Sequence, residues 1–143
     1  MDYKGQISVE YLLLIVVILI ILGVVTLPLI GKTIDASNDI SWTSDAKNTI
    51  ASVANAVNIV YSNGPQSKRT LTVYIPKNGM QFNNTSNYLG LITTLNDGTN
   101  KTVNSTIYYP VTTNINTLNK GWYNVVVYWA VGQNSINVNL TST

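Results

Sequence analysis

The sequence predicts an α+β fold, in which one long N-terminal helix packs on one face of a C-terminal antiparallel β-sheet. Two patterns predict it. Apolar residues first form a nearly continuous run and then recur at three- and four-residue steps as far as Tyr61, which is typical of a helix. From Ser67 onward they alternate with polar residues, which is typical of strands joined by short turns. Because a sheet with one apolar face needs a cover, the helix is expected to supply it.

The first half of the predicted helix is apolar on every side. Tyr11–Ile30 is an almost purely aliphatic run of 20 residues. As a helix it would be about 30 Å long, which matches the hydrocarbon core of a bilayer. Pro28 has no backbone N–H and cannot donate the helical hydrogen bond to the carbonyl of Val24. A kink or a short melted stretch is therefore expected over residues 24–31.

The second half of the helix, over residues 32–63, is amphipathic, and its apolar side is expected to lie across the sheet. A glycine followed by a proline, Gly64-Pro65, ends it. The residues that define the apolar side are Ile34, Ala46, Ile50, Val53, Ala54, Val57, Val60 and Tyr61.

Strands are predicted within residues 67–141. Their ranges are 70–76, 88–95, 103–109, 122–131 and 136–140. The segment 122–131 is apolar on both faces except at Asn124, so it is expected at the centre of the sheet. Asn96-Asp97-Gly98 has the composition of a tight turn, and Lys77–Asn87 is predicted to be a loop. The opposite face of the sheet carries Thr, Asn and Tyr, and is expected to meet solvent, sugars or another subunit.

Composition excludes several classes of function. The chain has no cysteine and no histidine, which removes disulfides, thiolate metal sites and the commonest general base. A net charge of +2 is too small to indicate nucleic-acid binding. Only 10% of the residues are charged, against roughly 25% in an average domain, which suits a protein that works outside the cell. No nucleophile, base or metal-binding cluster converges, so neither enzymatic activity nor a cofactor is expected.

Three interpretations of the apolar run compete. A secretory signal peptide would have a shorter core of about 7–15 residues and a small-residue cleavage site, which residues 27–31 do not offer. A permanent membrane anchor holding a domain outside the cell fits the length. Its flanking charges give a weak orientation signal, because Lys4 is offset by Asp2 and Lys32 lies on the far side.

The third interpretation rests on Lys4-Gly5-Gln6-Ile7-Ser8-Val9-Glu10, which leads directly into the apolar run. This start resembles the class III (prepilin) signal peptides of archaeal type IV pilin-like proteins, whose motif is Gln-x-Ser-x-Glu. The resemblance covers about the first 30 residues. It implies cleavage between Gly5 and Gln6 by a membrane-embedded prepilin peptidase, and a role in processing or assembly for Ser8 and Glu10.

The domain organisation that this resemblance implies has three parts. Residues 1–5 would be a cleaved leader, 6–31 an apolar helix that spans the membrane and later forms the filament core, and 32–143 a globular pilin domain. Within that domain, the amphipathic helix takes residues 32–63 and the β-sheet residues 67–141.

The function that the resemblance implies is that of a pilin, the structural subunit of a type IV pilus-like adhesion filament. The precursor would lie in the cytoplasmic membrane and the mature chain in a filament at the cell surface. Its partners would be identical subunits, the peptidase, and an assembly platform with its ATPase. Open alternatives are a minor pilin or a membrane-anchored binding module that does not polymerise. An archaellin is favoured less, because those subunits have a different pattern at the helix start.

Glu10 places a carboxylate at the edge of a membrane-length apolar helix, where an ionised group is costly. Cleavage would make Glu10 the fifth residue and would create a cation, the α-amino group of Gln6. A pair between the two, within one chain or between neighbours, would set the axial register of a filament. Alternatively, Glu10 simply suits the positive end of the helix dipole.

Five Asn-x-Ser/Thr sequons make the chain a candidate for N-glycosylation on at least one of them. Asn104 and Asn139 are expected on the polar side of strands, and the other three in turns or loops. The five asparagines are Asn83, Asn84, Asn100, Asn104 and Asn139.

Overall fold

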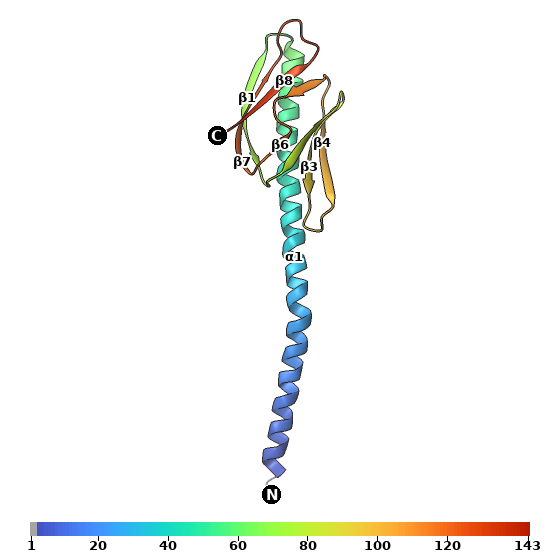
Figure 1. Cartoon of the computed structure of the whole chain (residues 1–143), viewed down its shortest axis with the longest axis vertical. Coiled ribbons are helices and arrows are strands. Elements are labelled where there is room, and N and C mark those ends of the chain that lie inside the picture. The colour runs from blue at the N-terminus through green and yellow to red at the C-terminus, as the bar shows by residue number, and fades with distance from the viewer. Residues whose placement is uncertain (1–2) are drawn as a thin grey trace. The chain divides into compact units, whose positions relative to one another are not determined.

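A computed structural model describes the backbone of residues 3–143 and the side chains from Val9 onward. One helix, α1 (Tyr3–Asn63), precedes all the strands (Figure 1). The strands are β1 (Lys68–Ile75), β2 (Met80–Asn84), β3 (Tyr88–Thr94), β4 (Asn100–Thr106), β5 (Val111–Thr113), β6 (Thr117–Leu118), β7 (Gly121–Tyr128) and β8 (Ile136–Ser142). The chain divides into two compact units between Asn38 and Asp39.

Helix α1 stays helical through Pro28, so the expected melted stretch is wrong. The helix persists because proline removes only one backbone hydrogen bond, whereas melting a turn would break several. A helix can remain continuous and still bend, so the expected kink at Pro28 stays a prediction.

The second unit, Asp39–Thr143, contains the hydrophobic core. Its strands form two four-stranded sheets, ordered β1-β7-β8-β5 and β4-β3-β2-β6. We call these the first and the second sheet. Residues 39–63 of α1 contact both, because Thr49 Oγ1 donates to the Tyr74 carbonyl in β1 and Asn58 Nδ2 donates to the Thr106 carbonyl in β4. The predicted α+β class, a long helix packed on an antiparallel-rich sheet, is confirmed.

The apolar side of the helix within this unit is the one that the sequence predicts. Fully or nearly fully buried helix residues are Ala46, Ile50, Val53, Ala54, Ala56, Val57 and Val60. Ile34 and Tyr61, at the two ends of the predicted stripe, are exposed instead. The covered stripe therefore begins at Ala46, later than the repeat of apolar residues in the sequence.

Strand β7 lies between β1 and β8, at the inner position predicted for it. Its two faces differ, however: Tyr123, Val125 and Val127 are buried, while Trp122 is 58% exposed. Opposite Val125 stand Leu71 in β1 and Leu140 in β8, both of which face the same core. The turn predicted at Asn96-Asp97-Gly98 is present, with Gly98 at a φ of 84°.

Two expectations about the strands are wrong. The predicted loop Lys77–Asn87 contains β2, which pairs with β3 and β6. Its two asparagines hide the strand pattern, yet Met80 is fully buried in the core. In addition, β5 pairs with β8 in parallel, so the first sheet is not antiparallel throughout. Strands of two or three residues, such as β5 and β6, are too short to leave a period-two pattern.

The helix–sheet core gives a direct test of this packing. Ile50→Ala should lower the free energy of unfolding of the second unit by about 2–5 kcal/mol, because Ile50 is fully buried. Ile40→Ala on the same helix is the matched control: its side chain is 71% exposed, so the change should stay within about 0.5 kcal/mol. Urea unfolding of the detergent-solubilised chain, followed by tryptophan fluorescence, measures both. Equal effects would contradict the packing described here.

Candidate functional site

The largest uncovered feature of the described residues is the aliphatic half of α1. Every large apolar side chain between Tyr11 and Ile30 is 42–72% exposed. Soluble proteins rarely leave contiguous apolar patches of more than a few hundred Å² in water. Among the described residues, one helix is long and apolar enough to cross a membrane. This surface therefore needs a cover.

Two kinds of cover suit an all-round aliphatic helix. Lipid tails accept it because its backbone groups are satisfied within the helix. Other aliphatic helices accept it equally, since burial of each large side chain away from water is worth about 1.5–3 kcal/mol. Moving the helix from lipid to a bundle of such helices changes its free energy little, because lipid tails are as apolar as leucine.

The residues that the sequence marks for cleavage and processing lie at the start of α1. The backbone of Gly5, Gln6 and Ser8 belongs to the helix, and their side chains lie outside the described residues. Glu10 is exposed, and its position three and four residues before Leu13 and Leu14 places it at the border of the aliphatic surface. A carboxylate there would enter any interface that covers this surface.

One acidic side chain has a role that the sequence did not indicate. Both carboxylate oxygens of Asp39 accept from the Asn96 amide, each at 3.1 Å. This contact fastens the β3–β4 turn to the helix. Nearby, the Lys77 ammonium lies 4.5 Å from the centre of the Trp42 ring, a cation–π contact. Among the described residues no group of three or more acidic side chains is placed to hold a metal ion.

The sequons occupy strands more often than expected. Asn83 and Asn84 lie in β2 and Asn100 begins β4, so the expected turn or loop positions of these three are wrong. Asn104 lies in β4 and Asn139 in β8, and both are strand positions as predicted. The error has the same source as the missed β2 strand: asparagine is abundant in this chain at strand positions as well as in turns.

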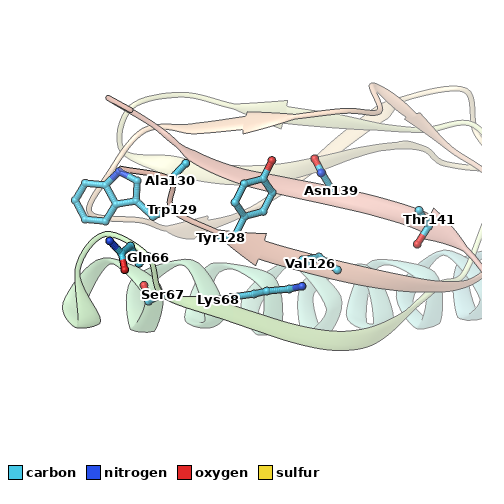
Figure 2. Close-up of a pocket in the computed structure, with 9 residues that line it drawn as sticks. All are labelled: Gln66, Ser67, Lys68, Val126, Tyr128, Trp129, Ala130, Asn139 and Thr141. Carbon is cyan, nitrogen blue, oxygen red and sulfur yellow. The ribbon is translucent and has the colours of Figure 1, made fainter. Parts of the chain in front are cut away.

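A groove of about 590 Å³ lies on the face of the first sheet that points away from the core. Figure 2 shows the side chains of Tyr128 and Asn139 on neighbouring strands of this groove. Thr141 lies further along β8, and Trp129 closes one end, where its ring lies 4.7 Å from that of Tyr109. Its lining residues are Gln66, Ser67, Lys68, Val126, Tyr128, Trp129, Ala130, Asn139 and Thr141.

Comparison with known families identifies the start of the chain. Residues 4–29 match the family model described as the class III signal peptide. The match supports a type IV pilin-like precursor and implies processing by a prepilin peptidase. No curated protein and no solved structure gives a significant match.

The native N-terminus separates the three interpretations of the apolar segment. We expect the exported chain to begin at Gln6, because peptidase cleavage at a class III signal precedes the apolar run and retains it. Mass spectrometry of the intact protein from its own cells measures this. A start at Met1 would indicate a permanent anchor, and a start near Gly31 a secreted monomer; either would contradict the expectation.

Proposed function

We propose that this chain is the structural subunit of an archaeal type IV pilus-like filament that attaches cells to surfaces. The observation that carries the proposal is the combination of a class III signal peptide at residues 4–29 with an exposed aliphatic helix that continues into a folded β domain. In such a chain the aliphatic helix dissolves in the membrane and stays on the protein after cleavage. The β domain dissolves in water and stays outside the cell.

In this account the aliphatic helix serves twice. Before assembly, Tyr11–Ile30 lies in the cytoplasmic membrane and holds residues 39–143 on the outer side. During assembly, the helix leaves the lipid and packs among the same helices of other subunits. Because each subunit uses one surface to contact a different surface of the next, the contacts need not close and a helical filament results. The exchange of covers gains little by itself, so an assembly platform with its ATPase is proposed to drive it.

Glu10 is proposed to set the register of this packing. Cleavage after Gly5 creates the α-amino group of Gln6, and the aliphatic surroundings of a filament core would exclude water from both groups. An unpaired charge in such a place costs several kcal/mol, whereas a paired one is close to neutral. Subunits would therefore be held where each Glu10 meets an α-amino group, on its own chain or a neighbour.

The signal peptide alone leaves two other functions open. An archaellin would use the same processing to build a swimming filament. A minor pilin, or an anchored binding module that does not polymerise, would keep the helix in the membrane. We favour the pilin over the archaellin because the processing motif has the Gln-x-Ser-x-Glu form at Gln6, Ser8 and Glu10.

The proposal predicts fibres that contain this chain and depend on Glu10. Electron microscopy of material sheared from cells should show them, and Glu10→Gln should reduce their amount by roughly tenfold or more, since the α-amino group would lose its partner. Glu10→Asp keeps the charge and is the matched control, expected to retain most of the fibres. Membrane levels and the N-terminus of each variant, measured in parallel, separate a defect of processing from one of assembly.

Normal fibres from Glu10→Gln would contradict the register role. Absence of this chain from any fibre, with its N-terminus at Gln6, would instead favour the binding module that does not polymerise.

A further inference from the structure

The last sequon of the chain opens into the groove on the first sheet. Asn139 and Thr141, its two defining residues, both line that groove (Figure 2). They share a face because residues two apart in a strand point the same way. Val126 stands directly opposite Asn139 in the neighbouring strand β7, and Tyr128 follows it on the same face.

The amide nitrogen of Asn139 is free to react, which distinguishes it from the amide nitrogen of Asn84. No hydrogen bond to the Asn139 side chain is formed within the described residues. Asn84 Nδ2, by contrast, donates to the Val111 carbonyl at 2.7 Å. A sugar on Asn84 would have to displace this hydrogen bond.

The groove has the chemistry of a sugar site. Its walls combine the half-buried ring of Tyr128 and the side chain of Val126 with hydroxyl, amide and ammonium groups from Thr141, Gln66 and Lys68. Sugars present a C–H face that packs on an aromatic ring and hydroxyls that bond to polar groups. The volume of about 590 Å³ lies within the range of about 300–1,000 Å³ that is common for small-molecule sites.

We propose that Asn139 carries an N-linked glycan whose first sugars lie in this groove, over Val126 and Tyr128. In the transfer, a bond forms between Nδ2 and the anomeric carbon of a sugar carried on a membrane-lipid diphosphate. The bond from that carbon to the phosphate oxygen breaks, the lipid diphosphate leaves with the electron pair, and the amide gives up one proton. The inference rests on the proposed function in one respect, since the transfer requires the second unit to be exported.

Mass spectrometry of a tryptic digest tests whether Asn139 carries a glycan, because trypsin separates this sequon from the other four. Lys120 is the last tryptic site, so trypsin releases Gly121–Thr143, which contains Asn139 as its only sequon. In protein from its native cells, this peptide should carry a glycan mass on Asn139. Thr141→Ala should abolish that mass, whereas Thr141→Ser preserves the sequon and should retain it. An unmodified peptide from the unaltered protein overturns the inference.

The same digest also reports on the proposed function. Trypsin releases Gln6–Lys32 from a chain cleaved after Gly5, and Gly5–Lys32 from an uncleaved chain. An unmodified Gly121–Thr143 alongside Gln6–Lys32 would overturn the glycan and leave the pilin proposal intact. An unmodified Gly121–Thr143 alongside Gly5–Lys32 would show that the proposed function had failed as well.

The position of the sugar is tested by the reactivity of Tyr128. Nitration of this ring with tetranitromethane should be slower in the glycosylated protein than in Thr141→Ala, by roughly threefold or more, because the sugar covers its exposed face. Tyr123 is buried and serves as the internal control within the same peptide. Equal nitration of Tyr128 in both forms would overturn the placement of the glycan in the groove.

Discussion

A helix with an aliphatic surface on all sides cannot stay in water, and the rest of this molecule depends on that constraint. Each large side chain between Tyr11 and Ile30 left in water instead of buried costs about 1.5–3 kcal/mol, while the second unit buries its core on its own. The helix must therefore always have lipid or other helices around it. The match to the class III signal peptide fits this requirement, since the proposed cleavage after Gly5 would leave the aliphatic run on the chain.

The second unit has the opposite requirement: its surface must be compatible with water, although the chain has few charged residues. One side of residues 46–60 of α1 covers both sheets, and Thr49, Asn58 and Asp39 fasten the helix to them by hydrogen bonds. Asn114 bonds both backbone groups of Leu140 through its side chain, at 3.0 and 2.8 Å. It continues the ladder of β8 beyond the end of its pairing with β5 and so protects that edge. Asparagine thus supplies much of the polar chemistry of this domain, including the sequon of the proposed glycan.

The features that were predicted correctly are those that leave a periodic pattern or a local motif in the sequence. The helix, its buried face from Ala46 to Val60 and the inner position of β7 follow from apolar spacing, and the signal peptide follows from a local motif. Strand β2 was missed because asparagine replaces its outer pattern, and the parallel pairing of β5 with β8 depends on contacts distant in sequence. The groove was not predictable either, because Lys68, Val126 and Asn139 come together only through the register of three strands.

Accessibility of the helix within intact fibres tests the central claim most directly. The chain has no cysteine, so Leu19→Cys and the exposed Thr112→Cys each provide a single thiol. In fibres sheared from cells, a water-soluble maleimide should label Thr112→Cys readily and should label Leu19→Cys only after the fibres are dissolved. Equal labelling of both thiols in intact fibres would contradict the account, because the aliphatic helix would then not be buried among its neighbours.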